Sequence, residues 1–129
     1  MAHILILEPD HLLAGNLKAY FASAKHTVSA HTDPQLALTS SDAQKPDIII
    51  AELQLAGRSG VEFLYEFRSY ADWQDIPIII FTNLHPEQMV NYQEVIKDLS
   101  VFSCIYKTQS GLADLLDVVH QSLPAYAEV

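Results

Sequence analysis

Four short apolar runs divide the chain, and each is too short for a typical helix. They cover residues 4–7, 48–51, 76–81 and 101–106. Because β-branched residues fill much of these runs without regular polar alternation, the pattern is typical of parallel strands that are buried on both faces of a sheet. A weaker run over 26–31 alternates apolar and polar positions, which predicts a further strand nearer the edge of the sheet.

The segments between these runs have apolar residues at spacings of three and four, which predicts amphipathic helices. Asp33 followed by Pro34 marks one helix start, because Asp is a good N-cap and Pro fits the first helical position. Ser59 is expected to cap another helix, and Pro124 is expected to end the last one. The predicted helices cover residues 11–24, a segment from 34 onwards, 59–70, 85–98 and 112–123.

Strands and helices therefore alternate in the order βαβαβαβαβα. This alternation predicts an α/β fold with right-handed crossovers and helices on both faces of a parallel sheet. We expect a flavodoxin-like (βα)5 three-layer sandwich with a five-stranded parallel sheet. One domain is expected over residues 1–124, followed by a frayed tail at 125–129.

Composition agrees with one globular domain. The chain has 129 residues, of which 50% are hydrophobic and 18% charged, and this balance excludes a disordered or low-complexity chain. The single cysteine, Cys104, cannot form an internal disulfide, so it fits a reducing compartment. Because it falls in a predicted buried strand, we expect it to act as an inert small hydrophobe.

The charge balance narrows the choice of partners. Seven Lys and Arg residues against 16 Asp and Glu residues give a net charge of −9, which opposes direct binding to nucleic acid. No stretch approaches the roughly 20 apolar residues of a membrane span, and the first residues do not resemble a signal peptide. We therefore expect a cytoplasmic protein without a nucleic-acid or membrane partner.

Polar residues gather where the predicted strands end. The sequence has Glu8-Pro9-Asp10 after the first strand, Glu52 after the third, Thr82 at the end of the fourth and Lys107 after the fifth. The carboxyl ends of parallel strands meet at one edge of the sheet, which is where sites of such folds lie. The sequence therefore predicts that these carboxylates, the hydroxyl and the ammonium lie close together.

These strand ends resemble those of the receiver domain of two-component response regulators. The resemblance runs from about His3 to Leu123 and is carried by ILILEPDHLLAGNLKAYF, PDIIIAELQLAGRSGVEFL, IPIIIFTN and CIYKTQSGLADLL. It implies an acidic pair that helps to bind Mg²⁺, a phosphoacceptor Asp at the end of the third strand, a switch Thr or Ser and a Lys followed by Pro. It also implies a loop that usually contains Pro and ends in Gly.

The match to this pattern is uneven. Four residues stand at family positions, namely Glu8 at the first acidic position, Gly60 at the loop glycine, Thr82 at the switch hydroxyl and Lys107 at the lysine. Four others depart from it, namely Pro9 at the second acidic position, Glu52 at the phosphoacceptor, Ala56 at the loop proline and Thr108 after the lysine. The resemblance therefore implies a receiver with an altered reaction centre.

The departures affect the chemistry directly. Mg²⁺ requires near-octahedral oxygen coordination, and Pro9 has no side-chain oxygen to offer. Glu52 is one methylene longer than Asp, which is expected to impair in-line phosphoryl transfer. We expect poor or absent autophosphorylation and no catalytic residue, so the chain is not expected to be an enzyme. Glu8, Asp10 and Glu52 remain weak candidates for Mg²⁺ ligands, although Asp10 equally suits an N-cap.

Glu52 also has a positive interpretation. Its carboxylate would lie about where an aspartyl phosphate oxygen lies, within reach of Lys107 and Thr82, and would partly mimic the phosphorylated state. The alternatives are a site locked in neither state and an ion-pair cluster that only adds stability or solubility. The alternative for Thr82, less favoured than the switch role, is that it simply caps the segment that follows it.

The leading hypothesis is a phosphorylation-independent receiver that acts as a protein-interaction module, with Glu52 in place of the phosphoacceptor Asp. The resemblance implies a partner face over roughly 86–122, with a histidine kinase, an output protein or a second copy as partner. The alternative is an atypical but functional phosphoacceptor receiver of a phosphorelay. A flavin carrier on the same fold is disfavoured, because the loop at 8–15 lacks a Gly-rich phosphate cradle and no cofactor is expected.

Overall fold

The computed structural model describes residues 1–55 and 57–123, and within them the predicted five-stranded parallel sheet is confirmed. The strand order is β2-β1-β3-β6-β7, so the weakly patterned strand β2 lies at an edge as expected. The strands are β1 (His3–Leu7), β2 (Thr27–His31), β3 (Ile48–Ala51), β6 (Ile78–Thr82) and β7 (Ser103–Tyr106). The central strands β1, β3 and β6 are buried throughout, which explains their uninterrupted apolar sequences.

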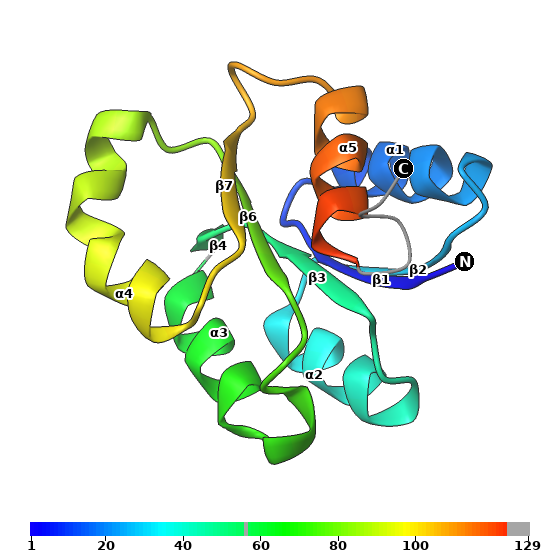
Figure 1. Ribbon diagram of the computed structural model, residues 1–129, viewed down its shortest axis with the longest axis horizontal. Helices are drawn as coiled ribbons and strands as arrows, with labels where there is room; N and C mark the ends of the chain where they lie inside the picture. Colours follow the sequence, from blue (N-terminus) through cyan, green and yellow to red (C-terminus); the bar gives the residue numbers. More distant parts are fainter. Residues whose placement is uncertain (56, 124–129) are drawn as a thin grey trace.

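Helices cover both faces of this sheet (Figure 1). They are α1 (His11–Ser23), α2 (Pro34–Ala43), α3 (Gly60–Ser69), α4 (Gln93–Asp98) and α5 (Leu112–Ser122), with 3₁₀ helices η1 (Ala71–Trp73) and η2 (Pro86–Tyr92). Helices α1 and α5 pack on one face, where Phe21 and Val119 meet Ile6 and Ile50. Helices α2 and α3 pack on the other face, where Leu38 and Phe67 join a second core. The three layers of the predicted sandwich are therefore present.

Side-chain caps fix the starts of several helices. The Asp33 carboxylate accepts a hydrogen bond from the Gln35 N–H at 3.0 Å, with Pro34 in the first turn of α2. The Ser59 hydroxyl accepts from the Glu62 N–H at 3.3 Å at the start of α3. Each cap satisfies a backbone donor that the first helical turn leaves unpaired. Both caps predicted from the sequence are thus confirmed.

The structure differs from the sequence prediction in several segments, including strand β7, which begins at Ser103 rather than at 101. The helix expected over 85–98 is split, with 3₁₀ helix in its first half, because apolar residues three apart fit 3₁₀ geometry as well as α. Strand β6 begins at Ile78 rather than 76, since Pro77 has no N–H for a ladder, although its carbonyl accepts from Ile49. A small antiparallel ribbon, β4 (Gln54–Leu55) with β5 (Arg58–Ser59), was not predicted.

Some predictions lie outside the described residues. These are the helix-ending role of Pro124, the frayed tail at 125–129, the domain end at 124 and the effect of Ala56. Within the described part of the chain, α5 already ends at Ser122. None of the helices in that part is long and apolar enough to cross a membrane.

Candidate functional site

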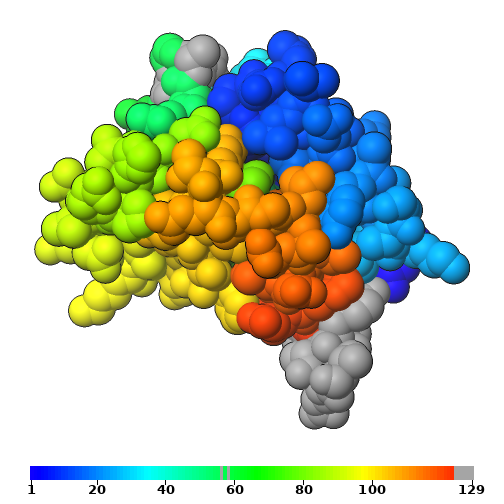
Figure 2. All heavy atoms as spheres, turned by 90° about the horizontal axis from the view of Figure 1, so that it is seen from above, coloured from blue at the N-terminus to red at the C-terminus, as the bar shows by residue number. Residues whose placement is uncertain are grey.

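The carboxyl ends of four adjacent strands bring the predicted residues together. Glu8 follows β1, Glu52 follows β3, Thr82 ends β6 and Lys107 follows β7. Figure 2 looks at the molecule from above, where the orange segment after β7 lies beside the blue segment after β1 and the green segment after β6. The backbone agrees with this view, because the Lys107 N–H donates to the Thr82 carbonyl at 2.9 Å.

At the centre of this edge, one lysine bridges two glutamates. The Lys107 ammonium lies 2.6 Å from Glu8 Oε1 and 3.0 Å from Glu52 Oε1. The side chains are nearly inaccessible to solvent, with exposures of 8% for Lys107, 3% for Glu8 and 1% for Glu52. Two carboxylates and one ammonium leave one net negative charge at a buried position. We call these three residues the carboxylate–lysine triad.

Backbone donors compensate the remaining charge of the carboxylate–lysine triad. Glu52 Oε2 accepts from the N–H of Leu53 at 2.6 Å and of Gln54 at 3.2 Å. Glu52 Oε1 accepts from the Asn83 N–H at 2.9 Å in addition to the lysine. Glu8 Oε2 accepts from the Asp10 N–H at 3.1 Å. All four carboxylate oxygens therefore have hydrogen-bond partners, as buried carboxylates require.

Thr82 is fully buried at the end of β6, and its hydroxyl takes the alternative role given above, that of a cap, rather than a contact with Glu52. Its Oγ1 accepts from the Leu84 N–H at 3.1 Å, so it caps the turn that follows the strand. The Glu52 carboxylate accepts a hydrogen bond from the Asn83 N–H instead. The expected contact between Glu52 and Lys107 is present, whereas a hydrogen bond between Glu52 and Thr82 is not among those of the described residues.

Asp10 lies beside the triad but points elsewhere. It is exposed, and its Oδ1 accepts from the N–H groups of Leu12 at 2.9 Å and Leu13 at 3.2 Å, as the N-cap of α1. It also lines a cavity of about 290 Å³ together with Lys107, Asn83 and residues at the start of α5. The N-cap interpretation of Asp10 is thus the one that its contacts support.

The residues of this edge do not fit the Mg²⁺ that the family resemblance implies. Glu8, Asp10 and Glu52 form no common site, since no group of three His, Cys, Asp or Glu residues suited to a metal occurs in the described ranges. The Lys107 ammonium already lies against an oxygen of each glutamate. Mg²⁺ would need those same oxygens at about 2.0–2.1 Å.

Gly60 fixes the loop that carries Glu52. A Cβ at position 60 would lie 2.5 Å from the Glu52 carbonyl oxygen and 2.7 Å from Leu53 Cα, so only glycine allows this approach. Gly57, with φ +68°, forms the turn of the β4–β5 ribbon. Sequence reasoning missed this ribbon and the backbone donors at 53, 54 and 83. The paired glycines in GRSG were the available signal of a tight turn.

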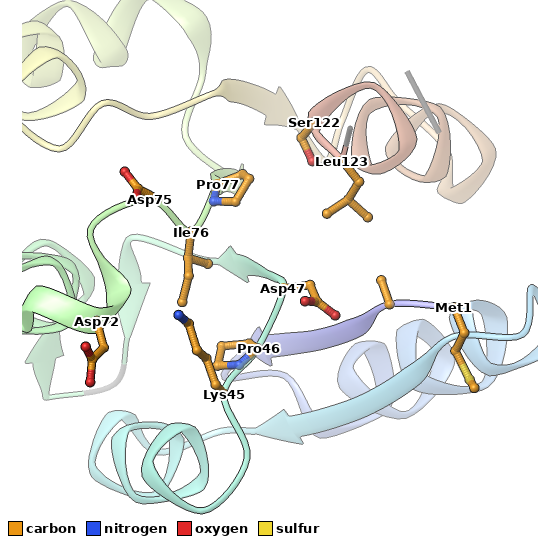
Figure 3. Close-up of a pocket in the computed structure, with 11 residues that line it drawn as sticks. Met1, Lys45, Pro46, Asp47, Asp72, Asp75, Ile76, Pro77, Ser122 and Leu123 are labelled. Carbon is orange, nitrogen blue, oxygen red and sulfur yellow. The ribbon is translucent and has the colours of Figure 1, made fainter. Parts of the chain in front are cut away.

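A larger cavity lies at the opposite, amino-terminal edge of the sheet (Figure 3). It has a volume of about 490 Å³ and is lined by the segments before β1, β3 and β6 and by the end of α5. Its carboxylates belong to Asp47, Asp72 and Asp75, and Asp47 is engaged by the His3 N–H at 2.7 Å. Because none of the strand-end residues reaches it, the carboxyl edge remains the candidate site.

Comparisons with known proteins show which family this chain is similar to. The model of the response regulator receiver domain family matches residues 4–120, which includes Glu8, Glu52, Thr82 and Lys107. Regulatory protein VanRB of Enterococcus faecalis is 32% identical over 85 residues, which cover 66% of this chain and 37% of that protein. Probable transcriptional regulator ycf29 of Cyanophora paradoxa is 28% identical over 95 residues, covering 72% of this chain and 45% of that protein.

This chain therefore spans less than half the length of either relative. Among solved structures, the chemotaxis response regulator CheY4 of Vibrio cholerae superposes with a TM-score of 0.83 at 20% identity. The superposition covers 95% of this chain and 99% of that one. At this identity the likeness shows a shared fold, and the chemistry must be argued from this chain's own residues.

Proposed function

Because this chain belongs to the response regulator receiver domain family, we propose that it is a phosphorylation-independent protein-interaction module of a signalling pathway. Receivers of this family act as signalling modules that work with kinases or output domains. The observation that carries the proposal is the buried ion pair of Glu52 with Lys107, 3.0 Å long, at the phosphoacceptor position.

The first support comes from how firmly Glu52 is held. Its two oxygens accept three backbone N–H groups and the Lys107 ammonium. An attacking carboxylate oxygen would have to give up such partners and align in line with the phosphorus, to within a fraction of an ångström. The held geometry therefore favours a structural role for Glu52 over a nucleophilic one.

The second support is a connection from Glu52 to the predicted partner face. Glu52 Oε1 accepts a hydrogen bond from the Asn83 N–H. The next residue, Leu84, donates its N–H to the Thr82 hydroxyl and is buried in the core. Met89 of η2 packs into the same core cluster as Leu84. Glu52 thereby sets the conformation of the segment that leads into η2 and α4, as a phosphoryl group would be expected to do.

The third support is the character of the face formed by η2, α4, β7 and α5. Val90 of η2 is 68% exposed and Phe102, which precedes β7, is 47% exposed. The same elements carry carboxylates: η2 has Glu87, α4 has Glu94 and Asp98, and α5 has Asp114 and Asp117. Exposed apolar side chains on elements that also carry charged residues are consistent with a protein-interaction surface.

The alternative function is that of an atypical receiver that still accepts a phosphoryl group. It is favoured by the retention of Lys107 and Thr82 at their family positions, and Lys107 also lines the cavity of about 290 Å³ at this edge. Treatment of the chain with a small phosphodonor and Mg²⁺, followed by intact-mass spectrometry, tests this alternative. A gain of one phosphoryl group mapped to Glu52 would establish it.

The proposal itself is tested by Glu52→Gln, which removes the charge and keeps the side-chain length. We expect amide chemical shifts to change from Asn83 into residues 86–106, because the ion pair with Lys107 is lost. Glu66→Gln on the exposed face of α3 is the matched control and should leave that segment unchanged. If Glu52→Gln left 86–106 at wild-type positions, Glu52 would not set the partner face and the proposal would fail.

A further inference from the structure

We propose that Lys107 is the resident cation of this site, with its ammonium in the place that a divalent metal would need between Glu8 and Glu52. The inference rests on the proposed function and extends it to the regulation of the site. It makes the conformation of the carboxyl edge independent of divalent metal ions, because the charge that a metal would supply is attached to the chain.

The Lys107 ammonium contacts both glutamates of the site. The ammonium lies within 3.0 Å of one oxygen of each glutamate. A Mg²⁺ at about 2.1 Å from Glu8 Oε1 would lie at most about 4.7 Å from Nζ, the sum of that bond and the 2.6 Å ion pair. Two like charges at this separation in a buried site repel strongly. Metal and ammonium therefore compete for the same oxygens.

Further contacts anchor Lys107 in this position. The Lys107 backbone N–H donates to the Thr82 carbonyl, which aligns the residue with the end of β6. Its ammonium lies 5.6 Å from the centroid of the Phe81 ring, within cation–π range. Backbone pairing, two ion pairs and the ring together hold the cation in place, whereas a free ion would lose translational freedom on binding.

Each carboxylate oxygen of Glu8 and Glu52 already has a partner. Backbone donors occupy Oε2 of both glutamates, at Asp10 for Glu8 and at Leu53 and Gln54 for Glu52. The remaining oxygens face Lys107, and Glu52 Oε1 also bonds Asn83. With the lysine in position, no oxygen of the pair is left without a partner. Without it, two buried carboxylates would be short of a counter-charge.

Because the carboxylates need a counter-charge, removing the lysine charge gives a test in which the variant should gain metal binding. In Lys107→Met the carboxylates should recruit a divalent cation, so the variant acquires the metal dependence that the wild-type chain lacks. The probe is Mn²⁺, followed by paramagnetic broadening of amide signals, with Mg²⁺ as the competing ion. Lys97→Met, which removes an exposed lysine from α4, is the matched control.

For the wild-type chain and Lys97→Met, we expect no selective broadening at residues 8, 52 and 83, and no change of Tm with Mg²⁺. For Lys107→Met, we expect selective broadening there, reversal by excess Mg²⁺, and a rise in Tm of a few degrees with Mg²⁺. Selective broadening in the wild-type chain would overturn the inference. So would a folded Lys107→Met that ignores both ions.

If Lys107→Met does not fold, Lys107→Gln provides the same test with a neutral side chain that can still donate a hydrogen bond to a glutamate. The wild-type titration with Mn²⁺ needs no variant and is decisive by itself. Metal binding by the wild-type chain would overturn this inference and leave the response of residues 86–106 to Glu52→Gln intact. Loss of that response would overturn the proposed function and leave the metal result intact, so the two failures are distinguishable.

Discussion

At the scale of single residues, the carboxylate–lysine triad concentrates three charges in a place that solvent hardly reaches. Each side chain of Glu8, Glu52 and Lys107 is less than one-tenth exposed. Such a group is stable only while every member keeps its partners, because an uncompensated buried charge is far more costly than a satisfied one. The stability of the site therefore depends most on its single cation.

Lys107→Met should lower the free energy of unfolding by about 3–5 kcal/mol, because it leaves two buried carboxylates without a counter-charge. Urea denaturation at neutral pH, without divalent ions, measures the change. Lys97→Met should stay within about 0.5 kcal/mol of the wild-type value, as exposed substitutions usually do. Equal stability of the two variants would contradict the role assigned to the triad.

Gly60→Ala tests the loop that carries Glu52. The added Cβ would clash with the Glu52 carbonyl and with Leu53, so we expect a loss of about 2–4 kcal/mol and displaced amide signals at both residues. Gly15→Ala in α1 is the matched control, because nothing lies within 4 Å of its Cβ. That variant should gain up to about 1 kcal/mol from helix propensity. A Gly60→Ala variant with the same free energy of unfolding as the wild-type chain would show that the loop can relax around the added methyl group.

Much of the site was predictable residue by residue, and the limit is physical. Glu8, Glu52 and Lys107 meet because parallel strands end at one edge, and the sequence pattern was enough to predict that. The sequence left two roles open for the Thr82 hydroxyl and could not decide between them, since the choice depends on the turn at Leu84 that it caps. The backbone donors to Glu52 depend on the loop conformation, which the pattern of side chains does not specify.

At the scale of elements, the secondary structure was predictable where burial determines it and was not predictable where local backbone geometry does. The runs at 4–7 and 48–51 became strands because both of their faces are covered by helices. The segment 85–98 became part 3₁₀ and part α helix, since both geometries place Met89 against the core. The hydrophobic pattern of segment 85–98 therefore does not distinguish between the two kinds of helix.

Helix α5 is tied to the amino edge of the sheet through a histidine pair. His26 Nε2 lies 3.0 Å from His120 Nε2, and His26 Nδ1 accepts from the Ala2 N–H. Burial, followed by the charges of His120 and of the chain's amino terminus, lowers the pKa of His26 below its ordinary value of 6.5. Burial likewise lowers the pKa of His3 and of His31.

These shifts fix the sign of the pH dependence. A depressed pKa means that the unfolded chain binds protons more readily, so the stability is present above pH 6.5 and is lost as the pH falls through the lower folded-state value. Urea denaturation between about pH 7.5 and 5.5 should show this decline, and His26→Gln should reduce it. His11→Gln, on the exposed start of α1, is the control. Constant stability over this range would contradict the prediction.

Arg68 links the end of α3 to two other segments. Its guanidinium donates to the carbonyls of Trp73, Gln74 and Ile76 at 2.8, 2.9 and 2.7 Å, and to that of Leu99 at 3.0 Å. Arg68→Met should cost about 2–4 kcal/mol in a denaturant titration, because these hydrogen bonds involve a charged donor. Arg68→Lys should recover only part of the lost stability, since an ammonium lacks the planar, forked arrangement of donors that a guanidinium has. Full recovery by Lys would show that charge alone matters.

At the scale of the whole molecule, the two edges of the sheet differ in their chemistry. The carboxyl edge holds a charge cluster that is satisfied internally, and the elements η2, α4, β7 and α5 beyond it carry several carboxylates and leave Val90 and Phe102 exposed nearby. A net charge of −9 adds a field that favours a basic partner surface. Under the proposals made above, the molecule combines the receiver fold with a reaction centre that would need neither metal nor phosphate to adopt a defined state.

The most direct test of that claim is an amide NMR titration of the wild-type chain with Mg²⁺ and then with Mg²⁺ plus beryllofluoride, a mimic of a bound phosphoryl group. We expect spectra that stay unchanged at both steps, because Lys107 and Glu52 already form an ion pair at 3.0 Å. Shifts centred on Glu8, Glu52 and Lys107 that spread into residues 86–106 would contradict it. They would mean that the site still binds the metal and responds to phosphorylation.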